Sequence, residues 1–383
     1  MTDLAARHLG ASVVAASDDS FGPKEALLRP GHVEFVPGTY DHKGEVVDGW
    51  ETRRRRDAGA DWVVIRLGVP GVIGCIDVDT TSFTGNAPAA CWVEACGAQG
   101  PLPADELTGW EGIVGRTPLR PDAQNRLTVS DSRAWTHVRL WADPDGGIGR
   151  VRVEGEPLPD PRWLDRLGVD LVAEQLGGRV LARTDEFYSP AAALLRPDRP
   201  RSMGEGWEAR RRRGPGHDSV TIALGVAGRI RVVEVGTSQF IHNASARFAL
   251  WTAHVAPATQ PPPPGDPGWR PLLAPTRLVP DAQHRFPVDG RTASHARLDA
   301  YPDGGVARLR LHGTPDPDAR AALGVRWFDT LPRPQALAVL DALPAALADC
   351  RPFRDRERLI AQVTAHAHDS GPATAFLRSV LGG

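Results

Sequence analysis

The chain has 383 residues, with 45 Lys and Arg against 47 Asp and Glu, which gives a net charge of −2. That balance argues against nucleic acid or an anionic membrane as the partner, because both reward a large positive excess. Hydrophobic residues at 41% and charged residues at 24% are typical of a globular protein of two or three domains. No window approaches the roughly 18 apolar residues of a membrane span. The first residues lack a secretory signal, so we expect a cytoplasmic protein.

From its first strand-like segment onward, the chain repeats itself. "LGASVVAASDDSF" from Leu9 returns as "LGGRVLARTDEFY" from Leu176, and "DGWETRRRR" at 48–56 returns as "EGWEARRRR" at 205–213. Self-similarity over this length indicates two copies of one domain. We therefore predict a first domain over residues 1–160, a second over 161–318 and a tail over 319–383.

Each copy reads as a series of short strands. Residues 137–154 alternate apolar and charged side chains around "DPDGG", which predicts an antiparallel hairpin. "DWVVIRLG" from Asp61 and "GVIGCIDVDTTSF" from Gly71 indicate further strands, separated by Gly, Pro and Asp clusters. The predicted fold class is all-β, with two tandem jelly-roll β-sandwich domains and a short α-helical C-terminal appendage.

The tail changes to helical chemistry over residues 326–368. Leu359, Ile360 and Val363 would share one helical face. The opening of this segment weakly resembles ureidoimidazoline decarboxylase, but the chain stops before that family's catalytic segment. We expect a docking or oligomerisation appendage and no second activity.

The motifs of the repeats resemble one family closely. "DGWETRRRR", "DWVVIRLG", "DVDTTSFTGN" and "THVRLWADPDGGIGRVRVEG" are together similar to allantoicases, over about residues 9–313. The resemblance implies a hydrolase of purine and allantoin degradation that converts allantoate to ureidoglycolate and urea. It also implies a homo-oligomer whose partner is the small-molecule substrate.

Allantoate carries one carboxylate and two ureido arms, so a site needs a fixed cation, hydrogen-bond partners and a group that moves a proton. Arginine suits the first task, because its planar fork holds a carboxylate bidentately. If residues 50–56 are extended, Glu51 shares a face with Arg53 and Arg55, which would form an ion-paired cluster. The alternative is a solvated edge whose arginines pair with neighbouring acids.

Carboxylates and histidines elsewhere supply further candidates. Asp77 and Asp79 lie two residues apart in a predicted strand and so project from one face. They could be paired carboxylates that act as acid, base or metal ligands, or they could simply form the polar end of the strand. Asp18 could belong to the site or cap a helix. The candidate catalytic residues are Glu51, Asp77, Asp79 and His137, and the candidate substrate-binding residues are Trp50, Arg53, Arg54, Asn86, Arg210 and Arg211.

The two copies differ at positions that could carry chemistry. Asp79 is matched by Gly236 and Thr52 by Ala209, whereas allantoicases usually keep an aspartate and threonine at the Asp79 position in both repeats. We therefore expect the first copy to supply the catalytic carboxylates. The second copy would then supply scaffold, an interface or arginine contacts.

Cofactors and rival functions stay open at this point. The carboxylates could hold a divalent cation such as Mn²⁺, but no histidine pair has a convincing metal spacing. The cysteines lack zinc-site spacing and are predicted to be reduced core residues: Cys75, Cys91, Cys96 and Cys350. The rival function is a tandem carbohydrate- or small-ligand-binding module without catalysis, since jelly-roll domains occur both in enzymes and in binding modules.

Overall fold

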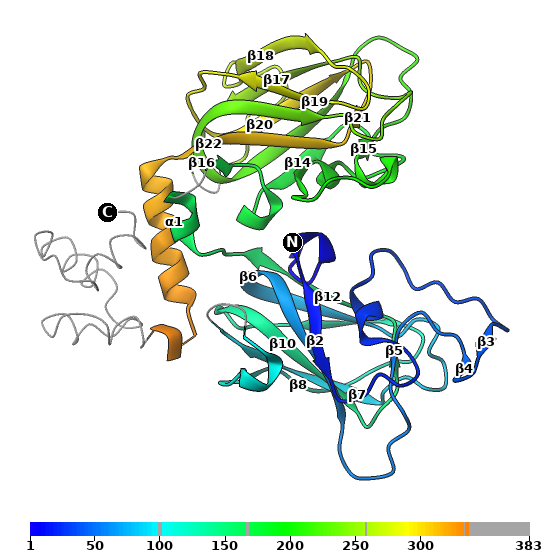
Figure 1. Ribbon diagram of the computed structural model, residues 1–383. Helices are drawn as coiled ribbons and strands as arrows, with labels where there is room; N and C mark the ends of the chain where they lie inside the picture. The colour runs from blue at the N-terminus through cyan, green and yellow to red at the C-terminus, as the bar shows by residue number, and fades with distance from the viewer. Residues whose placement is uncertain (99–101, 166–167, 257–258, 333, 337–383) are drawn as a thin grey trace, which may run out of the picture. The chain divides into compact units, whose positions relative to one another are not determined.

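The computed structural model describes residues 1–98, 102–165, 168–256, 259–332 and 334–336 (Figure 1). Residues 1–159 form one compact unit, unit 1, which the described residues from Arg326 onward also join. Residues 160–325 form a second compact unit, unit 2. Each unit has its own apolar core, so each copy of the repeat is a sandwich that buries its own strands.

Unit 1 is built around one long strand, β6 (Asp61–Asp79). Its first half pairs with β10 and β2, and its second half pairs with β12 and β9. The remaining large-sheet order is β1 beside β12, and β7 and β8 beyond β10. The bounds are β1 (Thr2–Asp3), β2 (Ser12–Ala16), β7 (Ala90–Cys96), β8 (Glu111–Pro118), β9 (Gln124–Thr128), β10 (Ala134–Asp143) and β12 (Arg150–Pro157).

β6 pairs with different strands on its two halves, and two glycines near its middle allow other backbone to approach closely. A Cβ at Gly68 would lie 2.7 Å from the backbone of Leu9, and one at Gly71 would lie 2.5 Å from the carbonyl oxygen of Glu156. Pro70 between them cannot donate to a ladder, which suits a break in pairing. The strand therefore turns over at this point and carries Asp61 and Asp79 back toward the same end of unit 1.

The predicted hairpin over residues 137–154 is wrong. β10 and β12 both pair with β6, on its two halves, and not with each other. The "DPDGG" turn instead carries the chain past β6, from β10 on one side of it to β12 on the other. The turn includes β11 (Gly147–Ile148), which pairs with β5 (Trp50–Glu51).

Short elements complete unit 1. β3 (Tyr40–Asp41) and β4 (Gly44–Glu45) form a small hairpin, in a stretch where the first copy is ten residues longer than the second. The 3₁₀ helices are η1 (Arg7–Leu9), η2 (Lys24–Leu28) and η3 (Ala104–Glu106).

Unit 2 repeats this arrangement around β16 (Asp218–Gly236), with the same order of neighbouring strands. Its strands are β13 (Val169–Asp170), β14 (Arg179–Arg183), β15 (Trp207–Glu208), β17 (Arg247–Ala253), β18 (Arg270–Arg277), β19 (Gln283–Pro287), β20 (Thr292–Tyr301), β21 (Gly305–Val306) and β22 (Arg308–Pro315). Its 3₁₀ helices are η4 (Pro161–Asp165), η5 (Glu174–Leu176), η6 (Ala191–Leu195) and η7 (Met203–Glu205).

The cores follow the predicted alternation. Val138, Leu140 and Ala142 are buried along β10, with exposures of at most 1%. Cys75, Cys91 and Cys96 are free and buried, which confirms the prediction for these three. Cys350 lies outside the described residues. Burial raises the pKa of the Cys91 thiol to about 12, so it stays protonated and inert.

Helix α1 (Pro317–Thr330) follows the second copy. Its start is earlier than the predicted helical segment, because Asp316 accepts hydrogen bonds from the backbone of Asp318 and Ala319 and Pro317 fits the first helical turn. The predicted helical face of Leu359, Ile360 and Val363 lies outside the described residues. None of the described helices is long and apolar enough to cross a membrane.

Candidate active site

The arginine run lies at the end of unit 1 where β6 begins. Trp50, directly before it, has no exposed surface, and its indole Nε1 donates to the carbonyl oxygen of Asp18 at 2.7 Å. A side chain without exposed surface cannot contact a ligand. The prediction that Trp50 binds substrate is therefore corrected, because Trp50 anchors the loop that presents the run.

Asp18 holds the first arginine of the run. Its carboxylate accepts from the backbone N–H of Arg53 at 2.9 Å and from Arg53 Nε at 2.8 Å. Partial burial works against ionisation, but the hydrogen bonds from Arg53 and Ser20 outweigh it and hold the pKa of Asp18 below its usual range. Asp18 is therefore part of the site and not a helix cap, since the 3₁₀ helix that follows is preceded by Pro23.

The third arginine is locked into the fold. Arg55 Nη1 donates to the buried carboxylate of Asp61 at 2.8 Å, and Nη2 donates to Asp57 at 3.0 Å. The backbone N–H of Arg55 donates to Asp145 Oδ2 at 2.7 Å. Asp18 and Asp145 thus fix the backbone of the run. Both terminal nitrogens of the Arg55 guanidinium are paired with carboxylates, so this side chain is not free for a ligand.

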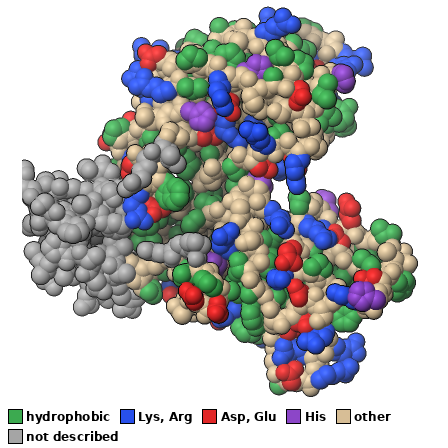
Figure 2. All heavy atoms as spheres, viewed as in Figure 1, with side chains coloured by type: hydrophobic (Ala, Val, Ile, Leu, Met, Phe, Trp, Pro, Cys, Tyr) green, Lys and Arg blue, Asp and Glu red, His purple; other side chains and the backbone are tan. Residues whose placement is uncertain are grey.

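A pocket of about 350 Å³ opens along the run, lined by Ser17, Asp18, Arg53, Arg54, Arg55, Arg56, Asp57 and Asp61. Figure 2 shows basic side chains, with acidic ones beside them, gathered at the loop between β5 and β6. Arg54 and Arg56 are exposed and form no ion pair with the residues that the structure describes. They are the cations free to hold an anion.

Glu51 lies beside this pocket without lining it. Its Oε1 accepts from Asn86 Nδ2 at 2.7 Å, and its backbone bridges to Gly22. Burial raises the pKa of Glu51, only partly offset by the Asn86 hydrogen bond. The predicted ion-paired cluster of Glu51 with Arg53 and Arg55 is wrong, since only residues 50–51 are strand and both arginines pair with aspartates.

Chain geometry limits the distance between Glu51 and the free arginine. Three residues of fully extended chain span at most roughly 10 Å, so the Cα atoms of Glu51 and Arg54 are no farther apart than that. The Glu51 carboxylate accepts from Asn86, whereas the Arg54 side chain lines the pocket.

A larger hollow of about 580 Å³ lies beside the β3–β4 hairpin. Its cations are Arg29 and Arg150, and both pair with Asp48. It therefore offers an anion less free positive charge than the pocket along the run.

His137 does not belong to this site. On β10 it pairs with Arg66, whereas Ala142, five residues on, pairs with Asp61 at the site end. At about 3.4 Å per residue, His137 lies about 17 Å along the strand from that end. Its ring is buried, and Nδ1 meets the Thr136 hydroxyl at 2.8 Å. Burial and the nearby Arg66 charge lower the pKa of His137 to about 4.

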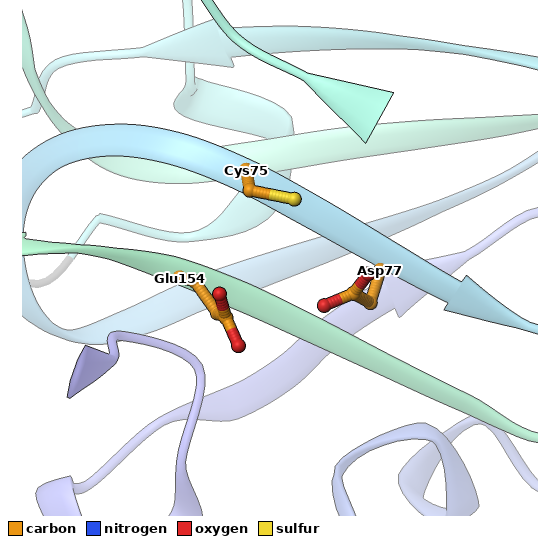
Figure 3. A group of neighbouring side chains, drawn as sticks. All are labelled: Cys75, Asp77 and Glu154. Carbon is orange, nitrogen blue, oxygen red and sulfur yellow. The ribbon is translucent and has the colours of Figure 1, made fainter. Parts of the chain in front are cut away.

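The paired aspartates of β6 have hydrogen-bond partners of their own. Asp77 accepts from Arg126 at 3.1 Å, and Asp79 Oδ1 accepts from the backbone of Thr81. Figure 3 shows Cys75, Asp77 and Glu154 directed toward one another, with ligand atoms within 4.8 Å. Arg126 also pairs with Glu154 at 2.6 Å, so an arginine already supplies the positive charge there.

Comparisons with known proteins identify the family. The family model for the allantoicase repeat matches residues 2–158 and 169–316. A Streptomyces coelicolor protein named probable allantoicase is 43% identical over 340 residues, 85% of this chain and 88% of the relative. A Nocardia farcinica protein of the same name is 46% identical over 319 residues, 82% and 94% of the two chains. The chain belongs to the allantoicase family.

The fold agrees with a solved allantoicase too. The crystal structure of allantoicase from Saccharomyces cerevisiae matches with a TM-score of 0.69 at 28% identity, over 82% of this chain and 92% of that one. This confirms the predicted all-β, jelly-roll-like sandwich.

The candidate site includes residues that the sequence analysis did not select. Asp61 and Asp145 hold Arg55, and neither was a candidate. A signal was present, because both aspartates recur in the second copy as Asp218 and Asp303. The candidates Arg210 and Arg211 lie in unit 2, on the second copy of the run.

Proposed function

We propose that the chain hydrolyses allantoate to ureidoglycolate and urea, at the site around the arginine run of unit 1. The single observation that carries this is the pocket with two unpaired arginines, Arg54 and Arg56, beside the half-buried Glu51. Membership of the allantoicase family supplies the reaction, and the geometry supplies a place for its three requirements.

Substrate binding would use the free cations first. The Arg54 fork, with Arg56 beside it, holds the allantoate carboxylate, because neither guanidinium is committed to a protein carboxylate. Asp18 and Asp61 hold their arginines in place and so keep the pocket open without neutralising these two.

Proton movement would fall to Glu51. The reaction breaks one bond between the central carbon and a ureido nitrogen. The oxygen of water and one of its protons become a hydroxyl on that carbon, and the other proton goes to the leaving nitrogen, which releases urea. A carboxylate whose pKa is raised by burial is a stronger base once ionised. Asn86 holds Glu51 by its amide N–H, which leaves the amide oxygen to accept from a ureido arm.

No step in this mechanism runs through a metal ion. The carboxylates that could hold Mn²⁺, Asp77 and Glu154, share Arg126, and a cation would have to compete with that guanidinium. A requirement for metal is measured directly, by assay with and without chelator and added Mn²⁺.

The binding-module alternative is not favoured, since the identity to proteins named allantoicase extends through both repeats. Among the tryptophans of unit 1, Trp92 stacks on Trp141 at 5.2 Å and Trp141 Nε1 donates to Glu94, so these two rings are partnered within the fold.

We further propose that the protein acts in the cytoplasm as a homo-oligomer, with the small-molecule substrate as its ligand and no nucleic acid partner. The near-neutral charge and the family support this. Fractionation and light scattering would measure both properties.

The test of the function is urea release from allantoate by the purified chain, compared with Arg54→Ala and with Arg7→Ala. Arg7 is an exposed arginine near the opposite end of unit 1 and serves as the matched control. Activity in the wild type and in Arg7→Ala, with a strong loss in Arg54→Ala, supports the proposal. No urea above background under any metal condition would refute it.

A further inference from the structure

The end of unit 2 repeats the anchoring contacts of unit 1. Trp207 Nε1 donates to the carbonyl oxygen of Asp185 at 2.9 Å, as Trp50 does to Asp18. The backbone N–H of Arg210 donates to Asp185 Oδ1 at 2.8 Å, and that of Arg212 donates to Asp303 Oδ2 at 2.8 Å. The second arginine run, residues 210–213, is therefore held by two carboxylates like the first.

The reactive pair is present in unit 2 as well. Glu208 Oε1 accepts from Asn243 Nδ2 at 2.6 Å, and Glu208 bridges to Ser189 as Glu51 bridges to Gly22. Arg212 pairs with the buried Asp218. Arg211, the counterpart of Arg54, is exposed and forms no ion pair with any described residue.

The two losses that predicted an inactive second copy have structural replacements. At Gly236, the counterpart of Asp79, an added Cβ would lie 2.8 Å from the Gln283 amide, which occupies the space. In unit 1 the Thr52 hydroxyl accepts from the Gly146 N–H. In unit 2 the Ser245 hydroxyl accepts from the N–H of Gly305, the next glycine of the corresponding turn, at 3.0 Å.

The rim of the second site has larger exposed aromatic and apolar side chains than the rim of the first. Ser20, Phe21 and Thr84 are replaced by Phe187, Tyr188 and Ile241, all more than half exposed. The Arg210 guanidinium lies over the Phe187 ring at 4.3 Å and is 3.8 Å from Asp185, whereas Arg53 is 2.8 Å from Asp18.

This rim changes what the site offers a ligand. Gly214 stands where the first copy has Asp57, which removes one carboxylate from beside the run. The second run is therefore less neutralised, and Phe187, which is 58% exposed with the Arg210 guanidinium over its ring, adds aromatic surface beside the run.

We propose that unit 2 holds a second, self-contained binding site for a carboxylate ligand with a planar ureido arm. Arg211 and Arg210 take the carboxylate, Asn243 and Glu208 take the ureido arm, and Phe187 covers its face. The ligand class rests on the proposed function, and the site departs from the sequence-based expectation that only the first copy is complete.

The test counts ligand sites on the full chain by isothermal titration. The probe is hydantoate, which has one carboxylate and one ureido arm but no second ureido group to lose. The wild type binds two molecules per chain. Arg54→Ala and Arg211→Ala each remove a different one, with affinity falling at least about tenfold at the altered site. Phe187→Ala weakens only the site that Arg211→Ala removes.

The outcomes separate this inference from the proposed function. One hydantoate site, lost in Arg54→Ala and unchanged in Arg211→Ala, overturns the inference even if allantoate is hydrolysed. No hydantoate binding at all also overturns it. Two sites in a chain that releases no urea from allantoate support the inference and refute the function. Because these side chains are exposed, thermal melts should show each variant folded.

Discussion

Replacing Arg55 with methionine removes the cation that faces the buried carboxylate of Asp61. Asp61 is 2% exposed, and its Oδ1 accepts from Arg55 at 2.8 Å and from the Ser17 hydroxyl at 3.0 Å. Its Oδ2 is buried without a hydrogen-bond partner among the described residues. Methionine fills the space but leaves this carboxylate unpaired.

The size of the effect follows from that burial. Breaking a buried ion pair by removing one partner costs roughly 3–5 kcal/mol, because a charge is left uncompensated. For a unit of this size, that corresponds to a fall in melting temperature of roughly 6–20 °C. The matched control is Arg116→Met, since Arg116 pairs with Asp143 but its side chain is 61% exposed. Such surface pairs contribute about 0–1 kcal/mol.

The assay is denaturant unfolding and calorimetry of the full chain for Arg55→Met, Arg116→Met and the double variant Arg55→Met with Asp61→Leu. The double variant should recover most of the lost stability, because an apolar pair replaces the buried ions. Equal, small losses for Arg55→Met and Arg116→Met would refute the reasoning. They would show that Asp61 needs no cation.

Three further predictions concern the site and its surroundings. Glu51→Gln should lower kcat for urea release by about a hundredfold or more; wild-type activity should fall as pH drops through the raised pKa of Glu51, and the variant should lack this limb. Arg54→Lys should raise KM although charge is kept, because the bidentate fork is lost; unchanged kinetics would contradict this. The contribution of His137 to the unfolding free energy should fall by about 3 kcal/mol as pH drops from 6.5 to about 4, because the unfolded chain protonates His137 and the native chain does not. His137→Gln should flatten that slope, and an unchanged slope would contradict the assignment to His137.

The fold was predictable because its signals are local or repeated. Alternation along residues 137–142 and 150–154 marked strands that the structure contains. The pairing of those strands was not predictable from the same pattern, because a turn between two strands does not show which neighbour each strand takes. The 19-residue strand β6 lies between β10 and β12. Pro70 interrupts its sequence, so the sequence alone indicated two separate strands where the structure has one.

The candidate site was predicted from the duplicated run, but the pairing of its side chains was not. The duplicated run drew attention to Glu51, Arg53 and Arg54, which lie at one end of unit 1. Strand periodicity then paired Glu51 with arginines, and failed because the run is not a strand. The true partner of Glu51, Asn86, is 35 residues away, and sequence spacing cannot show such contacts.

Four consecutive arginines are compatible with a folded unit because they have different roles. Arg53 and Arg55 are held by Asp18 and Asp61, and Asp18 and Asp145, from two other loops, accept from the backbone N–H groups of Arg53 and Arg55. The run is thus neither a solvated edge nor a set of four ligand contacts. Charge at the locked positions stabilises the loop, and charge at Arg54 is free for a ligand. Arg55→Lys should therefore lower the melting temperature, whereas Arg54→Lys should change the kinetics.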